Sequence, residues 1–366
     1  QDVTIACAEH HDSTADFRII HQQFWNFCYN LLYRRKGRYM YIPSKELLEK
    51  YAKVLINFAL NDGNGIRKNE VVYLASQTAG IPLAKEISRA ILKSGGFPLV
   101  ILQDDDFKLI QLQEGSDEQV GFFPEKFYKG LADQIDHYVR ILAEDDPLYL
   151  AKADPRKVIL SSRSTKPFRD WLDVKEDQGK FTWTLCMYGT DGCAKEANMS
   201  IEEYWEQINR ACFLYENDPV AKWKQVTSEM QDILEKLNDM RIEKVHVKAK
   251  NTDIWVQIGE RRKWLGGRGR NIPSFEIFTS PDWRGVNGTI FFDLPLYRYG
   301  NIIRDIQFEI KNGIIVKATA AENENLLREM LAQKNADKIG EFSLTDRRFS
   351  KINKFMANTL FDENFG

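Results

Sequence analysis

The stretch EVVYLASQTAGIPLAKEISRAILKSGGFPLVIL (residues 70–102) holds a strand, a helix and a second strand. Residues 70–74 form a short buried apolar run, and residues 81–96 repeat apolar side chains at helical spacing before ending at two glycines. Residues 97–102 are a second apolar run. Strand, helix and strand within about 35 residues are typical of a βαβ unit, so this stretch predicts a parallel sheet.

The segments around this unit are predicted from the same periodicities. Before it, Ser44 begins a capped amphipathic helix with apolar residues at i, i+3, i+4 and i+7. After it, the acidic stretches 104–106 and 114–119 are interpreted as solvated loops. Helices are expected near residues 124–145 and 200–240, and residues 157–161 are expected to form a strand.

The pattern changes near residue 240. Residues 244–271 alternate apolar and polar side chains, as a half-buried antiparallel strand pair does, and residues 311–313 (KNG) predict a hairpin turn. The predicted fold class is therefore mixed α/β and α+β. An N-terminal α/β domain with a mostly parallel sheet (40–240) is followed by an α+β domain with antiparallel strands (241–366).

Composition excludes several classes of protein. The 366 residues are 43% hydrophobic, which is enough apolar material for a packed core and excludes global disorder. Lysine and arginine number 51 against 53 acidic residues, so no positive excess favours binding to nucleic acid by bulk charge. No run approaches the roughly 20 apolar residues of a membrane span, so we expect neither a nucleic-acid partner nor a membrane.

The cysteines indicate the compartment. Five are scattered along the chain without a C-x-x-C pair, at positions 7, 28, 186, 193 and 212. We interpret them as buried free thiols in a reducing environment, and no secretory signal pattern opens the chain. The expected location is the cytoplasm.

The first 39 residues do not resemble the rest. The first methionine is Met40, and residues 34–38 (RRKGR) are all encoded by purine-rich codons, as a bacterial ribosome-binding site would be. We expect residues 1–39 to be a non-native or disordered extension, so its histidines carry no metal role. A native amphipathic helix is the alternative.

Glu276 is the first candidate site residue. It lies in a loop rich in Gly, Pro and Ser (267–288) and sits between two large apolar residues, where an unpaired carboxylate is costly. It needs a partner, which can be an arginine, a cluster of N–H groups or a metal ion. An ion pair with Arg268, Arg270 or Arg284 is the structural interpretation, while a metal ion is the functional one.

Glu341 is the second candidate, because it follows a strand-like Ile339-Gly340 in a similar setting. A helix is expected over residues 350–360, with Ile352, Phe355, Met356 and Leu360 on its core face. The triplet Asp362-Glu363-Asn364 then follows, and acids at a helix C-terminus oppose the helix dipole, so this triplet indicates binding or capping of another group.

A glycine-rich segment, one aspartate and two histidines are weaker candidates, because each fits an ordinary structural role. GGRGRN (266–271) lacks the context of a phosphate loop, and Asp253 is typical of an Asx turn. His246 is expected to face solvent or a neighbouring strand, and His137 to lie on a helix surface. No nucleophile elbow is found, which disfavours a serine hydrolase.

A family resemblance rests on many ordered segments. NTDIWVQIGERRKW, GRNIPSFEIFTSP, PLYRYG, KNGIIVKATA, KIGEFSLTDRRFSKI and NTLFDEN in the second half resemble the thermophilic metalloaminopeptidase family, the aminopeptidase S/T and aminopeptidase II group. In the first half, IPSKELLEKYAKVLINFAL, FTWTL, MSIEEYWEQINRACF and DPVAKWKQV fit the same family. The resemblance covers about Met40 to Gly366.

The resemblance implies a cytosolic, homodimeric exopeptidase that cleaves peptides with a free N-terminus, using two divalent metal ions (zinc, cobalt or magnesium). The family site contains two glutamates, two histidines, an aspartate and a tyrosine. Its glutamates match Glu276 and Glu341, whose separation of 65 residues (341 − 276) agrees with the family spacing. The family's histidine, tyrosine and His-x-Asp segments would follow Gly366, so we expect the catalytic domain to be incomplete at its C-terminus.

Two alternatives stay open from the sequence. One is a catalytically dead, truncated homologue that acts only as a dimerising or peptide-binding module. The other is a nucleotide-binding protein that uses the glycines of 266–271, which the missing motif context disfavours.

Overall fold

Five strands form a parallel sheet, and their order is β2-β1-β3-β4-β8. They are β1 (Val71–Gln77), β2 (Phe97–Gln103), β3 (His137–Leu142), β4 (Thr182–Met187) and β8 (Asn271–Ile272). The computed structural model describes residues 41–267 and 269–365. The sheet confirms the predicted βαβ unit, since α3 (Ile81–Lys93) connects β1 to β2. It also recruits β8 from beyond residue 240, so the second half of the sequence supplies one strand.

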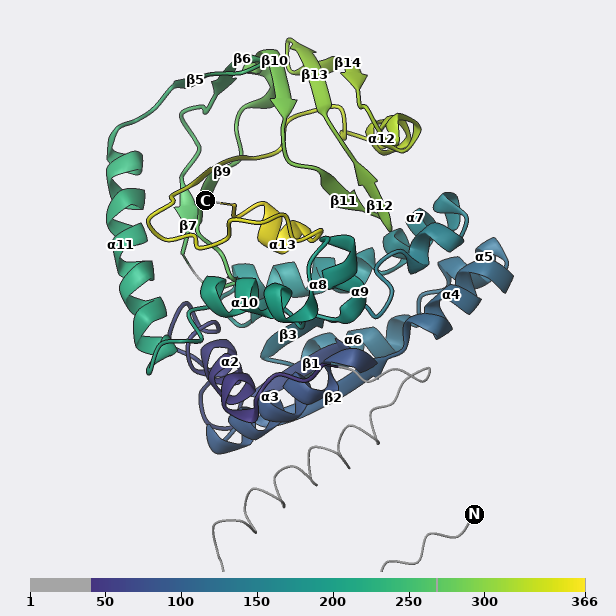
Figure 1. Cartoon of the computed structure of the whole chain (residues 1–366), viewed down its shortest axis with the longest axis vertical. Helices are drawn as coiled ribbons and strands as arrows, with labels where there is room; N and C mark the ends of the chain where they lie inside the picture. The colour runs from purple at the N-terminus through teal and green to yellow at the C-terminus, as the bar shows by residue number, and fades with distance from the viewer. Residues whose placement is uncertain (1–40, 268, 366) are drawn as a thin grey trace, which may run out of the picture. The chain divides into compact units, whose positions relative to one another are not determined.

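Helices surround this sheet (Figure 1). In chain order they are α2 (Lys45–Asn57), α3, α4 (Asp105–Glu114), α5 (Asp117–Gly121), α6 (Glu125–Gln134), α7 (Pro155–Ser164), α8 (Lys166–Asp177), α9 (Asp191–Glu196), α10 (Ile201–Ala211) and α11 (Pro219–Asp239). The predicted cap of α2 is confirmed, because the Ser44 side chain accepts a hydrogen bond from the Leu47 N–H.

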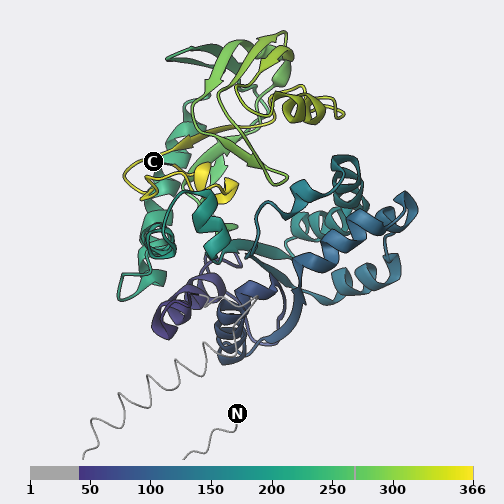
Figure 2. The same ribbon diagram turned by 45° about the vertical axis from the view of Figure 1, so that its right-hand side comes forward.

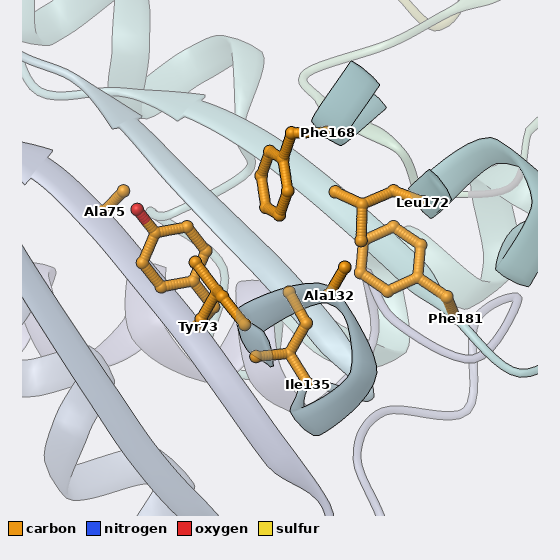
Figure 3. Packing of buried hydrophobic residues seen from close by; sticks show 8 residues of the cluster. Tyr73, Ala75, Ala132, Ile135, Phe168, Leu172 and Phe181 are labelled. Carbon is orange, nitrogen blue, oxygen red and sulfur yellow. The ribbon is translucent and has the colours of Figure 1, made fainter. Parts of the chain in front are cut away.

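One buried cluster shows how α6 and α8 attach to the sheet (Figure 3). Tyr73 and Ala75 of β1 pack with Ala132 and Ile135 at the end of α6, and with Phe168, Leu172 and Phe181 from α8 and the segment after it. The ring of Tyr73 stacks on Tyr138 of β3, with centroids 4.8 Å apart. Apolar burial of this kind is the main favourable term in folding.

The second half is mostly antiparallel, as the alternation predicts. One sheet has the order β14-β13-β10-β6-β5, a second has the order β15-β9-β7, and β11 pairs with β12. The bounds are β5 (Lys244–Ala249), β6 (Thr252–Gln257), β7 (Leu265–Gly266), β9 (Glu276–Thr279), β10 (Asn287–Phe292), β11 (Leu296–Arg298), β12 (Asn301–Ile303), β13 (Ile306–Lys311), β14 (Ile314–Thr319), α12 (Glu324–Leu331), β15 (Phe342–Thr345) and α13 (Thr359–Asp362). The KNG turn joins β13 to β14, so the predicted hairpin is confirmed.

An aromatic group ties the segment before β9 to the helices. Phe275 stacks on Trp223 of α11, with centroids 5.4 Å apart, and Trp223 stacks on Phe58 at the end of α2. In Figures 1 and 2, α13 (yellow) lies between the parallel sheet and the antiparallel strands. The segment that carries Glu276 is therefore anchored from the first half of the chain.

Three sequence-based assignments in the first half are wrong. The helix expected over 124–145 ends at Gln134, because residues 137–142 alternate buried and half-buried side chains and form β3. The acidic stretches begin helices, since Asp104 caps α4 and Ser116 forms a capping box with Gln119 in α5. Residues 157–161 lie in α7, which Asp154 caps.

The helix expected over 350–360 is also wrong. Only α13, four residues long, forms in that part of the described chain, and Ala357 before it has a left-handed backbone with φ of 50°. The core role is nonetheless confirmed, because Ile352, Met356 and Leu360 are buried. The spacing of apolar residues predicted which side chains of 350–360 are buried. It did not predict the backbone conformation, which depends on side chains that hydrogen-bond to that backbone.

The remaining predictions about the whole chain have mixed outcomes. Cys186, Cys193 and Cys212 are buried free thiols, as expected. The extension at 1–39, Cys7, Cys28 and Arg268 lie outside the described residues. Within those residues, no helix has both the length and the apolar character needed to cross a membrane. The division at residue 240 stays a prediction.

Replacing Phe275 with alanine should reduce the free energy of unfolding by about 3–5 kcal/mol, because its ring is 1% exposed and stacks on Trp223. Phe107→Ala is the matched control, since that ring is 77% exposed and its removal should change stability by less than about 0.5 kcal/mol. Urea unfolding followed by tryptophan fluorescence measures both. Equal effects of the two substitutions would contradict the packing described here.

Candidate functional site

Strand pairing brings the segments of the two predicted glutamates together. Glu276 begins β9 and lies opposite Thr345 of β15, and Glu341 directly precedes β15. Side chains alternate along a strand, so Thr345 and Ser343 point to the same side of β15. That side is the one on which Glu276 lies, since the Ser343 hydroxyl donates a hydrogen bond to Glu276 Oε1 at 2.9 Å. The 65-residue separation in sequence is thus closed by one antiparallel pair.

Glu276 is 9% exposed and has an unusual charge state. Burial raises its pKa to about 7, the Ser343 hydrogen bond lowers it, and the negative charge of Glu341 raises it. Burial also raises the pKa of Glu341. The Coulombic influence of Glu341 on Glu276 places the two carboxylates near each other, as the metal interpretation requires.

The arginines proposed as partners of Glu276 are occupied elsewhere. Arg270 bonds to Glu176 and lies 3.2 Å from Asp62, and Arg284 pairs with Asp282 at 2.7 Å. The ion-pair interpretation of Glu276 therefore fails for these two residues, while Arg268 lies outside the described chain.

A third carboxylate, Glu363, belongs to the same group; the sequence marked its triplet for binding or capping of another group but did not name Glu363 as a metal ligand. It follows α13, and burial together with the charges of Glu276, Glu341 and Asp362 raises its pKa to about 8. Glu341 and Glu363 keep exposed surface, so water screens part of this repulsion. The signal that could have found Glu363 is the DEN triplet, which stood out as acids at a helix end.

The other two members of the triplet hold the backbone. Asp362 accepts hydrogen bonds from the N–H groups of Met356 (2.7 Å) and Asn358 (2.8 Å). Asn364 is fully buried and accepts one from the Phe275 N–H at 2.6 Å. The prediction that the triplet binds or caps another group is thus confirmed for these two residues, and Asn364 links the segment of Glu363 to the residue before Glu276.

The described residues hold no ready-made metal cluster. Within 41–267 and 269–365, no three His, Cys, Asp or Glu side chains converge closely enough to hold an ion. The donor chemistry nevertheless fits a divalent cation, because the charge of Glu341 raises the pKa of Glu276, the charges of both raise the pKa of Glu363, and none of the three forms an ion pair with a described basic residue. The residues present supply negative charge that a cation would neutralise.

A pocket of about 640 Å³ opens beside this acidic group, and Glu363 lines it. Leu142 at the end of β3 and Leu185 of β4 line it from the parallel sheet, and Tyr297 of β11 lines it from the second half. The volume lies within the range of small-molecule sites, so a short peptide segment can enter.

The glycines of 266–271 have structural roles. A Cβ on Gly266 would lie 2.3 Å from the Glu276 carbonyl oxygen, and one on Gly269 would lie 2.7 Å from the carbonyl oxygen of Ala59. Gly266 lets β7 approach β9, and Gly269 lets the chain pass α2. Close backbone packing explains this segment without a bound phosphate.

The histidine predictions had different outcomes. His137 is buried in β3 and bonds to Glu70 and Thr182, each at 2.8 Å, so its assignment to a helix surface was wrong. His246 stacks on Trp255 of the neighbouring strand. It had been expected to face either solvent or a neighbouring strand, and the second is the case. Asp253 bonds to His246 at 2.7 Å instead of closing an Asx turn.

Comparison with known proteins now assigns the family. The model of the thermophilic metalloprotease (M29) family matches residues 44–366, which is most of the chain. The chain belongs to the thermophilic metalloprotease (M29) family. Members of this family are peptidases, so the chain is a peptide-bond hydrolase, and the resemblance read from the sequence is confirmed. Metal ions are expected in a metalloprotease.

Relatives share the fold at low identity. Aminopeptidase PepS of Streptococcus thermophilus is 26% identical, with 89% of this chain and 83% of the relative covered. Aminopeptidase T of Thermus thermophilus is 26% identical, with 87% and 83% covered. The solved structure of wild-type AmpT from Thermus thermophilus superposes with a TM-score of 0.76 at 24% identity, covering 87% of this chain and 83% of that one. This superposition confirms the predicted mixed fold class.

Glu363→Gln should change how the metalloprotease responds to pH. In the folded state the pKa of Glu363 is about 8, above its ordinary 4.5, so the folded protein holds a proton that the unfolded chain has released. Its contribution to stability is full below pH 4.5 and is lost as pH rises towards 8. The Tm of Glu363→Gln, relative to wild type, should therefore increase across this window in EDTA.

The exposed Glu118 of α5 provides the control for this measurement. The Tm difference between Glu118→Gln and wild type should stay constant over the same pH range. A constant difference for Glu363→Gln as well would show that Glu363 is not held near the other acids.

Proposed function

We propose that this metalloprotease is a metal-dependent aminopeptidase, which hydrolyses the first peptide bond of substrates with a free N-terminus at a site with two divalent metal ions. The relatives PepS and aminopeptidase T carry aminopeptidase names, and the family is one of metalloproteases. The observation that carries the proposal is the meeting of Glu276, Glu341 and Glu363 beside a pocket, without a basic partner among the described residues.

These three carboxylates are the proposed metal-binding residues. In the structure as it stands they do not converge on a single point, so binding would draw them together. Bound cations would supply Lewis-acid activation of the scissile carbonyl and of water. Zinc, cobalt and magnesium are the candidates, and carboxylates alone favour the harder ions.

Chain residues prepare the site in three ways. Ser343 donates to one oxygen of Glu276 and so orients that carboxylate. Glu276 and Glu363, with pKa values of about 7 and 8, hold protons near neutral pH, and cation binding would release these protons. Glu363 also lines the pocket, where an oxygen of its carboxyl group can accept a hydrogen bond from the α-ammonium group of a peptide.

The wider organisation belongs to the same proposal. A catalytic unit at 241–366, an α/β unit at 40–240, a homodimer and a cytoplasmic location follow from the resemblance to the family. Light scattering coupled to size-exclusion chromatography measures the dimer directly. The non-catalytic alternative has less support, since a module that only dimerises does not need a cluster of carboxyl groups with raised pKa values.

Glu276→Gln and Glu341→Gln should each remove metal and activity. We expect bound zinc, cobalt or magnesium, measured by mass spectrometry, to fall for both, and kcat/KM on leucine p-nitroanilide to fall about 100-fold or more. Glu118→Gln on the exposed face of α5 is the matched control and should retain both. Unchanged metal content in Glu341→Gln would refute the proposed site, and an inert wild type with bound metal would favour the non-catalytic alternative.

A further inference from the structure

The pocket beside Glu363 also holds an amino group that lacks an acidic partner. Lys108 of α4 lines this pocket, and its Nζ donates to Gln111 Oε1 at 3.1 Å and to the hydroxyl of Ser161. Neither acceptor is charged. Burial alone lowers the pKa of Lys108, and no carboxylate of the described chain forms an ion pair with it.

Other lysines of the first half are satisfied differently. Lys129, Lys152 and Lys166 pair with aspartates on the surface. Lys157 donates to the carbonyl of Gly115 at 2.7 Å, and Lys175 to the carbonyls of Ala132 and Ile135. Like Lys157 and Lys175, Lys108 has only uncharged acceptors, but of these three lysines only Lys108 lines the pocket, where a half-buried ammonium without an anion is costly. An anionic ligand would remove this cost.

The wall around Lys108 suits a carboxylate. Ser161, Ser162 and Thr165 of α7 and its end line the same pocket, and hydroxyl groups donate to carboxylate oxygens. The wall that carries Glu363 is acidic, and Glu144 lines the same pocket. One pocket of about 640 Å³ therefore presents a cation and an acidic group to the same ligand.

A short peptide carries the matching charges. Its α-ammonium group suits the acidic wall, and a carboxylate farther along suits Lys108. We infer that Lys108 binds a carboxylate of the peptide, and that short peptides with a free C-terminal carboxylate are the preferred substrate class. The orientation of the peptide rests on the proposed aminopeptidase function, while the carboxylate contact rests on the pocket alone.

Calorimetric titration of the full chain in EDTA tests the contact without catalysis. Leu-Gly-Gly as the free acid should bind about 10-fold more tightly than Leu-Gly-Gly amide, since a charge-assisted hydrogen bond contributes that much. Lys108→Met should reduce the affinity for the free acid to that for the amide, and Lys108→Arg should preserve the difference. Lys157→Met, which removes a lysine outside the pocket, is the control and should leave both affinities unchanged.

A third peptide identifies the carboxylate. If Leu-Glu-Gly amide binds as tightly as Leu-Gly-Gly acid and loses this in Lys108→Met, Lys108 binds carboxylates in general, and acidic side chains are included. Equal binding of acid and amide by the wild type, or a difference that survives in a folded Lys108→Met, overturns the inference.

Hydrolysis is measured separately with added metal. Carboxylate-dependent binding without hydrolysis would leave this inference standing and refute the proposed function. If Leu-Gly-Gly acid and Leu-Gly-Gly amide are both hydrolysed but bind with equal affinity, the proposed function stands and this inference is refuted.

Discussion

The hydrogen bond from the Phe275 N–H to the side chain of Asn364, 2.6 Å long, holds the acidic site together. Glu276 and Glu363 each lie one residue away from a partner in this bond, so it keeps two carboxylates close although their charges repel. Asn364 also donates to the Leu360 carbonyl at 3.1 Å, and Phe275 is anchored by its stack on Trp223. The fixed backbone therefore keeps the carboxylates of Glu276 and Glu363 close, although their repulsion would otherwise move these side chains apart.

That repulsion is the physical basis of the site. Burial and like charge raise the pKa of Glu276 to about 7 and of Glu363 to about 8, which is an arrangement that destabilises the metal-free protein at neutral pH. Perturbed carboxyls of this kind cluster at functional sites more often than at structural ones. The neighbouring pocket is lined by both Lys108 and Glu363, and we propose that it recognises both charged groups of a peptide.

Much of the fold could be predicted from the sequence, because hydrophobic periodicity and turn residues lie within the segments that they determine. The βαβ unit of 70–102 and the KNG hairpin carry their own periodicity and turn residues, and both are confirmed. Caps at Asp154 and Ser116 were equally local but were overlooked, so two helices were assigned as strand and loop. Residues 350–360 could not be assigned this way, because their backbone depends on Asp362 and Asn364.

The metal-ligating role of the candidate residues stays a prediction. Glu276 and Glu341 stood out as carboxylates in apolar surroundings and matched the family segments, and the pairing of β9 with β15 brings their segments together. Glu363 was missed because its neighbours come from distant segments that no spacing rule connects. The same bond that assembles them spans 89 residues of sequence. During synthesis, the strand bearing Glu276 therefore leaves the ribosome well before Asn364 is made, and this hydrogen bond can form only after 89 further residues have been added.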